Sequence, residues 1–507
     1  MLLAFPRRVS FLGPLTRYLS GSGHNQRFRV AIVGTGPAGF YTAHHLLNKS
    51  NGLSISIDFY DRLPAPHGLS RYGVAPDHPE VKNCEEYMDN LMRDHKDNVR
   101  FFGNVNVGRD ITLKNLQEIY HSIVLSYGCT SSDNRLDIPG ADSPAVISAR
   151  QFVNWYNSHP DSEYTEALIP PPLDKIENVT IIGNGNVAID VARVLLADPT
   201  SHWAPTDISV EAVELLRKSA VKRVNIVARR GLLESAFTNK EIRELTDLSK
   251  NSNVRFIPID SEIMDRIKPN EKQLSRVDKR KFSILEKASK EAMKLEQDPN
   301  CKQWALEFQK SPKEFVKDPE DPSLLRETVF EINELVQDSL TKRVSVKGTG
   351  ETTTIPNGLV ILSIGYKGSP LEGFDEVGLA FDIKKNCLVH KGGRLMLKDK
   401  VSDDLEYNYS YDKGWYTSGW IKSGPRGVIA TTMMESFDTA NNILEDLNNG
   451  IFNKPSKEHG DIDLPDHAVT WEGWTKLDKY EVQEGQRLHK TRVKVPTVRE
   501  MLNIANA

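Results

Sequence analysis

Two glycine-rich segments with the same layout constrain this chain more than any other feature. "RVAIVGTGPAGFYTAHHLL", residues 29–47, combines an apolar strand, a glycine turn and a helix. "VTIIGNGNVAIDVAR", residues 179–193, repeats that order. A strand, a glycine turn and a helix together form a dinucleotide-binding unit, in which the helix N-terminus holds a pyrophosphate. The sequence therefore predicts two dinucleotide pockets in one chain.

The first pocket has each part of the dinucleotide fingerprint. Gly34 permits a tight turn, Gly36 lets the backbone approach a pyrophosphate, and Gly39 lets helix and strand pack closely. Asp61 ends the next predicted strand, where a carboxylate accepts hydrogen bonds from an adenosine ribose. Because the strands, helix and acid are all present, a chance glycine-rich turn is disfavoured. The predicted site comprises Gly34, Gly36, Pro37, Ala38, Gly39 and Asp61.

The second pocket differs at the end of its second strand. Gly183 and Gly185 fill the first two glycine roles, and Ala188 replaces the third glycine. The following strand ends in "IVARRG", which places Arg229 and Arg230 where a carboxylate would bind a ribose 2′-hydroxyl. Guanidinium groups bind a 2′-phosphate through charge-assisted hydrogen bonds, so the pocket is predicted to prefer NADP over NAD. A solvated arginine pair is the alternative.

Two nucleotides in one chain suggest an electron path. The layout is typical of flavoproteins that hold FAD in the first pocket and bring a nicotinamide to it from the second. NADPH would then give a hydride to the flavin, which passes electrons onward.

Longer stretches resemble the mitochondrial adrenodoxin reductase family, also called NADPH:ferredoxin reductases. They include "YGVAPDHPEVKN", "AFTNKEIREL", "LSIGYKGSP" and "SGWIKSGPRGVIATTMMESFDTA", and the resemblance runs from about residue 29 to 445. Asp61 stands where the family often has Glu, and Leu232 where it often has Pro. The resemblance implies FAD contacts from Ala38, Asp61, Leu69, Val107, Trp420, Gly427, Val428 and Ile429. It implies NADP contacts from Asn184, Gly185, Asn186, Val187, Arg229, Arg230, Glu241 and Gly427.

The same resemblance places Gly427 at the contact between nicotinamide and flavin, where a side chain would block stacking. Val428 and Ile429 would begin a helix whose positive end stabilises reduced flavin. Hydride transfer needs stacking geometry rather than an acid or base. His78 and Asp190 are candidate catalytic residues, as proton or coupling groups near the flavin, although a single histidine is more often structural.

The electron acceptor follows partly from elimination. Cys84, Cys129, Cys301 and Cys387 lie far apart, which disfavours a redox disulfide, an iron–sulfur cluster or a bound metal. Elimination and resemblance together imply a separate, acidic [2Fe–2S] ferredoxin.

Candidate docking residues are Arg243, Arg276, Lys279, Arg280 and Lys281, for which a solvated helix face is the alternative. A flavin monooxygenase or oxidase is the competing function, and a nucleotide-sensing flavoprotein without catalysis is a third. The sequence leaves open whether the ferredoxin serves cytochrome P450s, iron–sulfur cluster assembly or haem A synthesis.

Location is predicted from the N-terminus and the overall charge. Residues 1–25 are rich in arginine, and Asp58 is the first acidic residue of the chain. This pattern is typical of a mitochondrial transit segment leading to the matrix, with a disordered basic tail as the alternative. No apolar run approaches the roughly 20 residues of a spanning helix, but association with the inner membrane stays open. The net charge of −4 disfavours nucleic-acid binding.

The fold is predicted to be α/β, with two Rossmann-like dinucleotide-binding domains of the glutathione-reductase type. The chain is too long for one ordinary core. Residues 28–132 and 368–507 would form a discontinuous FAD domain, and residues 133–367 an inserted NADP domain, in a monomer. Lys367 is a candidate crossing point between them. We expect a solvated helical insertion over residues 262–320, a surface loop at 397–414, a helix from Val428 towards Gly450, and no clear periodicity in the last 50 residues.

Overall fold

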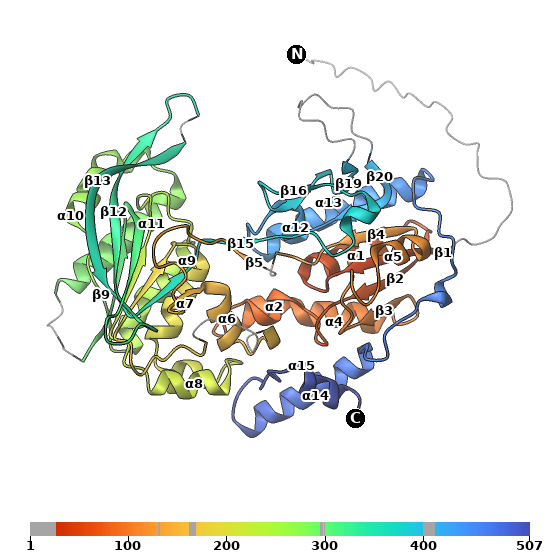
Figure 1. The fold of residues 1–507 in the computed structure, drawn as a ribbon, viewed down its shortest axis with the longest axis horizontal. Coiled ribbons are helices and arrows are strands. Elements are labelled where there is room, and N and C mark those ends of the chain that lie inside the picture. The colour runs from red at the N-terminus through yellow and green to blue at the C-terminus, as the bar shows by residue number, and fades with distance from the viewer. Residues whose placement is uncertain are drawn as a thin grey trace, which may run out of the picture.

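The computed structural model describes residues 27–129, 132–161, 169–294, 298, 300–341, 343–398 and 411–507. The predicted transit segment, residues 1–25, lies outside these ranges. The described chain forms two lobes side by side, each built around its own β-sheet (Figure 1). We call the part around the seven-stranded sheet the first lobe and the part around the six-stranded sheet the second lobe.

The first lobe is built on a sheet with the strand order β18-β19-β20-β4-β1-β2-β3. The first glycine segment forms β1 (Arg27–Val33) and α1 (Pro37–Asn48), and β1 pairs in parallel with β2 (Ser54–Tyr60). α13 (Ile429–Asn448), from the far end of the chain, packs against α1. The other strands are β3 (Val99–Phe102), β4 (Ser122–Leu125), β18 (His390–Lys391), β19 (Arg394–Met396) and β20 (Tyr411–Thr417).

Shorter elements surround this first sheet. They are α2 (Leu69–Tyr72), α3 (Pro79–Lys82), α4 (Cys84–Asp94), α5 (Leu113–Ile119), α12 (Trp420–Ser423), β16 (Phe381–Asp382) and β17 (Cys387–Leu388).

The second lobe contains a parallel sheet with the order β6-β14-β7-β8-β10-β9. The second glycine segment forms β7 (Asn178–Ile182) and α7 (Asn186–Leu196), and β7 pairs with β8 (Arg223–Val227). The remaining strands are β6 (Val146–Ser148), β9 (Val254–Phe256), β10 (Lys302–Glu307) and β14 (Leu359–Leu362). The helical crossovers include α6 (Ala149–Tyr156), a π-helical turn at Pro199–Trp203, α8 (Val210–Arg217) and α9 (Asn239–Asn251).

The expectation of a helical insertion over residues 262–320 is only half right. α10 (Ser261–Ile267) and α11 (Arg276–Ala292) are helical. β10 instead joins the second sheet between β8 and β9, because Trp304 and Leu306 are buried there. β11 (Lys310–Lys317) starts an antiparallel sheet with β12 (Leu325–Gln337) and β13 (Val344–Pro356).

The chain passes between the lobes at two short strands that pair with each other. β5 (Ser132–Asp133) leads into the second lobe and β15 (Tyr366–Lys367) leads out of it (Figure 1). Lys367 pairs with Ser132 in this antiparallel ribbon, so it does lie at the crossing. The first sheet therefore takes strands from both sides of the second in sequence, as a discontinuous domain requires.

The last part of the chain corrects two expectations and confirms one. The final residues contain α14 (Trp471–Arg487) and α15 (Val498–Ala505), although no periodicity was expected there. The predicted loop at 397–414 is wrong from Tyr411, where β20 begins, and residues 399–410 lie outside the described ranges. The expected helix is α13, and Gly450 follows its C-cap with a φ of +71°.

All four cysteines are free thiols, as the sequence predicts. Among the described helices, none combines the length and the apolar character needed to cross a bilayer.

Candidate functional site

The first glycine turn has space for a side chain at one of its three glycines and none at the other two. Gly34 has a φ of +100°, and a Cβ there would lie 2.6 Å from the Ser126 carbonyl oxygen. A Cβ on Gly39 would lie 2.3 Å from the Gly34 carbonyl oxygen. A Cβ on Gly36 would meet no protein atom within 4 Å. Gly36 is also the N-cap of α1, which no side chain caps. This open helix N-terminus fits a pyrophosphate.

Asp61 lies directly beside this turn. Its carboxylate accepts hydrogen bonds from the Thr35 backbone N–H at 3.0 Å and the Thr35 hydroxyl at 2.5 Å. The Leu63 N–H donates to its other oxygen at 3.0 Å. These contacts fix the carboxylate next to the glycine turn. Sequence reasoning did not single out Thr35, which is fully buried and holds Asp61 in place.

Two other segments approach the first turn through glycines. Gly68 immediately precedes Leu69, and a Cβ on Gly68 would lie 3.1 Å from the Gly36 Cα. Gly419 immediately precedes Trp420, and a Cβ on Gly419 would lie 2.5 Å from the Ala38 Cβ. The structure therefore brings the predicted FAD residues Leu69, Ala38 and Trp420 around one helix N-terminus.

The remaining predicted FAD residues lie in the same lobe. Gly427 has a φ of +84° and is exposed, and Val428 is the exposed N-cap of α13. Ile429 is the first residue of α13. Val107 is buried in the core of this lobe. A glycine with positive φ just before an uncapped helix end gives a second open N-terminus, which favours negative charge.

The second glycine turn repeats the geometry of the first. Gly183 has a φ of +115°, and a Cβ there would lie 2.1 Å from the Ser363 carbonyl oxygen. A Cβ on Gly185 would meet nothing within 4 Å, and Gly185 caps α7. Ala188 is fully buried, as its role in close packing requires. Val187 follows Asn186 in the first turn of α7.

A loop after β8 closes over this second turn. The Asn184 side chain donates to the Ser235 hydroxyl at 3.0 Å, and the Phe237 N–H donates to the Asn184 carbonyl at 3.1 Å. The Thr238 N–H donates to the Asn186 side chain at 2.8 Å. Asn184 and Asn186 therefore hold the loop after β8 against the turn.

Arg229 and Arg230 follow β8 with both side chains exposed. Their backbone carbonyls are held by the Asn333 side chain at 2.9 Å and the Gln309 N–H at 3.1 Å. Within the described part of the chain, neither guanidinium has an ion-pair partner. Two guanidiniums on a fixed backbone, free of acidic partners, suit a phosphate.

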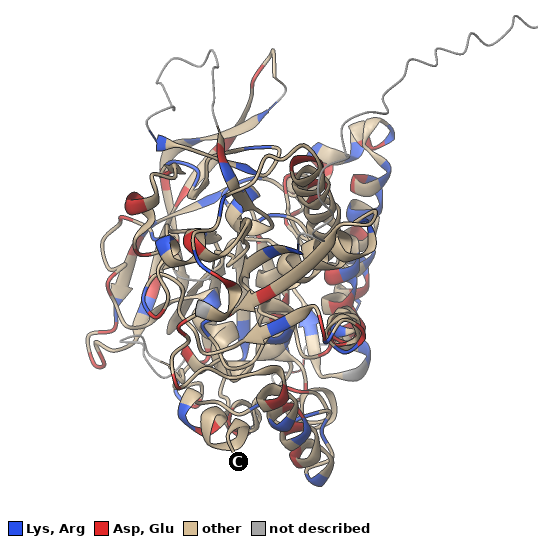
Figure 2. Cartoon of the chain, turned by 90° about the vertical axis from the view of Figure 1, so that its right-hand side faces the viewer, with Lys and Arg blue, Asp and Glu red and all other residues tan. Residues whose placement is uncertain are grey.

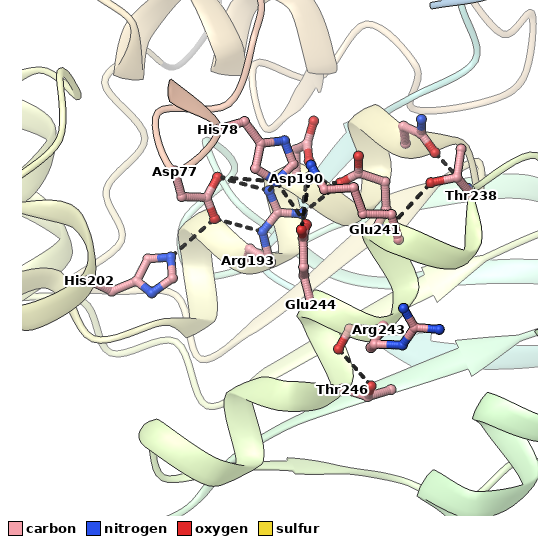
Figure 3. Close-up of polar contacts among 12 residues, drawn as sticks. Asp77, His78, Asp190, Arg193, His202, Thr238, Glu241, Arg243, Glu244 and Thr246 are labelled. Atoms are coloured by element: carbon pink, nitrogen blue, oxygen red, sulfur yellow. Dashed lines mark hydrogen bonds and ion pairs between the residues drawn. The ribbon is translucent and has the colours of Figure 1, made fainter. Parts of the chain in front are cut away.

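The candidate catalytic residues meet at the boundary between the lobes (Figure 3). The buried Arg193 guanidinium pairs with Asp77 through two bonds of 2.9 Å, with Asp190 at 2.9 Å and with Glu241 at 3.1 Å. His78 Nε2 lies 2.8 Å from Glu244 Oε2 and 3.2 Å from Arg193. The carboxylate only accepts, so the shorter contact indicates that His78 Nε2–H donates to Glu244. Arg193, Asp77 and Glu244 were not anticipated from the sequence.

Burial dominates the electrostatics of this cluster. Burial raises the pKa of Asp190 to about 7, with Arg193 opposing the shift and Glu241 adding to it. Glu241, for which the resemblance implies an NADP contact, is buried against Arg193, so it is not simply an exposed helix charge. The ligand atoms of His78, Asp190 and Glu241 lie within 4.8 Å of one another, a spacing that could hold a metal ion. The Arg193 guanidinium stands beside them, and its fixed charge opposes a cation there.

The predicted docking residues divide into exposed and buried groups. Arg276 and Arg280 are exposed at the start of α11, and Lys279 is half-buried. The Arg243 guanidinium points away from the Arg193 cluster (Figure 3). The prediction of Lys281 as a docking residue is wrong. Its ammonium is buried, donates to the Ser235 carbonyl at 2.7 Å and contacts the Phe237 ring. Basic and acidic residues are interspersed on the side shown in Figure 2, so docking needs a local patch.

Comparison with known proteins agrees with this geometry. The family model described as pyridine nucleotide-disulphide oxidoreductase matches residues 28–285. The chain is 38% identical to the human "NADPH:adrenodoxin oxidoreductase, mitochondrial", over 94% of this chain and 91% of that protein. It is 36% identical to the Saccharomyces cerevisiae "Probable NADPH:adrenodoxin oxidoreductase, mitochondrial", over 95% and 97%.

A solved structure shares the fold. Mycobacterium tuberculosis FprA in complex with NADPH superposes with a TM-score of 0.83 at 34% identity, covering 95% of this chain and all of that one. The fold is therefore of the two-domain, glutathione-reductase type that the sequence predicts. The chain belongs to the pyridine nucleotide-disulphide oxidoreductases and, among them, to the mitochondrial NADPH:adrenodoxin oxidoreductase family.

Proposed function

We propose that this protein takes a hydride from NADPH onto bound FAD and passes electrons singly to a [2Fe–2S] ferredoxin of the adrenodoxin type. One observation carries the proposal: two open glycine turns lie in adjacent lobes, one beside a carboxylate and the other beside two exposed arginines. The relatives named for NADPH and adrenodoxin support the same activity. FAD supplies the chemistry, because a flavin accepts a hydride and can release its electrons one at a time.

The first lobe fits FAD. The Gly36 backbone would hold the pyrophosphate at the N-terminus of α1, and Asp61 would accept hydrogen bonds from the adenosine ribose. The N-terminus of α13 would lower the energy of negative charge on the flavin ring. The proposed FAD site consists of Gly34, Gly36, Pro37, Ala38, Gly39, Asp61, Leu69, Val107, Trp420, Gly427, Val428 and Ile429.

The second lobe fits NADPH. The Gly185 backbone would hold its pyrophosphate, and Arg229 with Arg230 would bind the 2′-phosphate that distinguishes NADPH from NADH. Gly427 has no side chain to keep nicotinamide and flavin apart. The proposed NADP site consists of Gly183, Asn184, Gly185, Asn186, Val187, Arg229, Arg230, Glu241 and Gly427.

His78 and Asp190 are proposed to control protons beside the hydride path. Asp190 has a pKa of about 7, so its proton is exchangeable near neutral pH. His78 donates to the half-exposed Glu244, which offers a route towards solvent. Neither residue is needed for the hydride itself, so each would change the pH dependence more than the maximal rate.

We further propose residues 28–132 and 368–507 as the FAD domain and 133–367 as the NADP domain, in a monomer. The two sheets and the ribbon of β5 and β15 support this division. Ferredoxin would dock on Arg243, Arg276, Lys279 and Arg280. The relatives are named as mitochondrial, and for this chain we propose the matrix, reached by the leader at residues 1–25.

A direct assay separates this function from its competitor. Purified protein with NADPH and an adrenodoxin-type ferredoxin should reduce the ferredoxin rapidly, and NADH should substitute poorly. A flavin monooxygenase or oxidase would instead consume oxygen and NADPH without ferredoxin, releasing peroxide or a hydroxylated product. Oxygen consumption that ferredoxin does not suppress would contradict the proposal.

A further inference from the structure

Arg193 is the most heavily paired buried cation at the boundary between the lobes. It lies in α7, the helix that the second glycine turn begins, yet its strongest contacts are with Asp77 of the first lobe. We propose that Arg193 is a positioning residue that sets the distance and orientation between the FAD site and the NADPH site. This inference rests on the proposed function and extends it to a residue outside both nucleotide sites.

On the first-lobe side, the contact leads back to the FAD turn. Asp77 lies in the segment that runs on from His67 and Gly68 through α2. The His67 N–H donates to the Thr35 carbonyl at 3.0 Å, and Gly68 packs against Gly36. Thr35 also holds Asp61. A displacement of Asp77 would therefore also move this short, packed segment, which contacts the turn proposed for FAD.

On the second-lobe side, the contact leads back to the NADPH turn. Arg193 lies two helical turns beyond Asn186, which begins α7, and Asp190 lies between them on the same helix. Glu241 belongs to α9, whose N-cap Thr238 donates its N–H to Asn186. The guanidinium thus ties two helices of the second lobe to one loop of the first.

The geometry of Arg193 supports positioning rather than simple charge balance. Asp77 binds Nε and Nη2 together at 2.9 Å each, while Nη1 faces Asp190 and Glu241. A planar guanidinium held on two edges fixes both distance and orientation, which a lysine ammonium cannot do. A buried ion pair adds little to stability, because removing both charges from water costs about as much as their attraction returns. Holding the two lobes in a fixed geometry therefore accounts better for this pair.

Three further contacts between the lobes lie away from both turns. Lys82 and Lys494 pair with Asp207 at 2.5 and 2.9 Å, and the Lys490 ammonium donates to the Ala204 carbonyl at 2.9 Å. These contacts hold the lobes together without touching α7. Lys490→Gln is therefore a matched control for loss of one contact between the lobes.

The test compares Arg193→Gln, Arg193→Lys and Asp77→Asn with Lys490→Gln and the unchanged protein. NADPH stacked on oxidised flavin gives a long-wavelength charge-transfer absorbance, which reports ring approach without turnover. The Arg193 variants and Asp77→Asn should lose most of this absorbance. Their limiting rate of flavin reduction by NADPH should fall roughly ten- to a hundredfold, with a smaller change in KM. Arg193→Lys should not restore either quantity, and Lys490→Gln should match the unchanged protein.

A second readout needs no nucleotide turnover. Amide hydrogen exchange of residues 73–78 should accelerate in the Arg193 variants while exchange in the sheets stays unchanged. Folded Arg193→Gln or Asp77→Asn protein with normal charge-transfer absorbance and normal limiting rate would overturn the inference. Absence of NADPH-driven flavin reduction in the unchanged protein would instead overturn the proposed function. Should Arg193→Gln fail to fold, the isosteric Asp77→Asn decides the question alone.

Discussion

The glycines of the two turns differ in what a side chain would meet, so alanine substitutions should separate folding from nucleotide binding. At Gly36 and Gly185 the backbone is extended and a methyl group meets no protein atom. Gly36→Ala should fold normally but retain less FAD, and Gly185→Ala should fold normally but show a raised KM for NADPH. A methyl group at Gly183 or Gly39 would strike a carbonyl oxygen.

Gly183→Ala and Gly39→Ala should therefore lower the melting temperature, because the main chain must move. Thermal unfolding and the ratio of flavin to protein after purification measure the two effects. Equal losses of stability for all four variants would show that the open positions do not face ligands.

The arginine pair gives a prediction about cofactor preference. Replacing Arg229 and Arg230 with glutamine removes charge-assisted bonds to the 2′-phosphate, each worth about 1.5–3 kcal/mol. The KM for NADPH should rise by roughly ten- to a hundredfold per residue, while the KM for NADH changes little. Arg326→Gln is the control, because Arg326 is an exposed arginine of the same lobe with its own partner, Glu327. A parallel loss with both nucleotides would contradict this role of the pair.

At the scale of single residues, the sequence identified the turns well and their supports poorly. Gly36 and Gly185 are recognisable because the fingerprint has fixed spacing. Thr35, Asp77 and Arg193 have no such signature, since their roles depend on which distant segments meet. The wrong prediction for Lys281 has the same origin. A charged side chain is usually exposed, but the Lys281 ammonium donates to the buried Ser235 carbonyl.

Among the elements, α11 offers the sharpest test of ferredoxin docking. Arg276 and Arg280 are exposed near its start, and Lys287 and Lys290 are exposed near its end. Arg276→Gln with Arg280→Gln should lower kcat/KM for ferredoxin several-fold at low salt and weaken its salt dependence, because steering charges are lost. Reduction of ferricyanide should not change.

The control is the double variant Lys287→Gln with Lys290→Gln, on the same helix. Steady-state rates at several ionic strengths measure both pairs. If the two double variants respond alike, the start of α11 is not the docking surface.

Two element errors show where pattern reading fails. β10 lies in a charged stretch, so the burial of Trp304 and Leu306 depends on neighbours that the local sequence does not reveal. In α14 the buried positions Trp474, Leu477, Glu481 and Gly485 follow a helical repeat, but two of them are not apolar. The buried Glu481 accepts hydrogen bonds from the buried Arg71 at 2.6 Å, a partner far away in sequence. The buried positions of α14 therefore repeat with a helical period, but the apolar residues of its sequence do not.

For the whole molecule, three histidines with lowered pKa values predict how stability changes with pH. His121, His159 and His390 each accept a backbone N–H at Nδ1, at 3.1, 3.0 and 3.2 Å. Burial, the largest cause, lowers the pKa of each from 6.5 to about 4. Between these values the unfolded chain binds more protons, so stability falls as the pH drops from about 6.5 to about 4.

Asp190 acts in the opposite direction, because its raised pKa favours the folded state as the pH falls below about 7. Three histidines outweigh one carboxyl group, so the free energy of unfolding should be lower near pH 5 than near pH 7 by at least about 1 kcal/mol. Urea unfolding at both pH values measures this, and His390→Gln should reduce the difference. Unchanged or greater stability near pH 5 would contradict the assignment of these three histidines as neutral in the folded state.

The division into two lobes was predictable because two separate strand–turn–helix fingerprints in 507 residues point to two sheets. The way the lobes meet was not. That boundary depends on side chains such as Arg193 and Asp77, whose partners lie more than a hundred residues away in sequence. Family resemblance implied which residues would lie beside the nucleotides, whereas the structure shows how the segments that carry these residues meet across the boundary.

Electrons are proposed to pass in order from NADPH to flavin to ferredoxin. Anaerobic stopped-flow absorbance on the purified flavoprotein follows each of these transfers. One equivalent of NADPH should bleach the flavin in a fast phase, and added ferredoxin should then restore the flavin colour in two one-electron steps while its own cluster is reduced. Flavin that NADPH does not bleach, or bleached flavin that ferredoxin leaves reduced while oxygen restores it, would contradict this order of electron transfer.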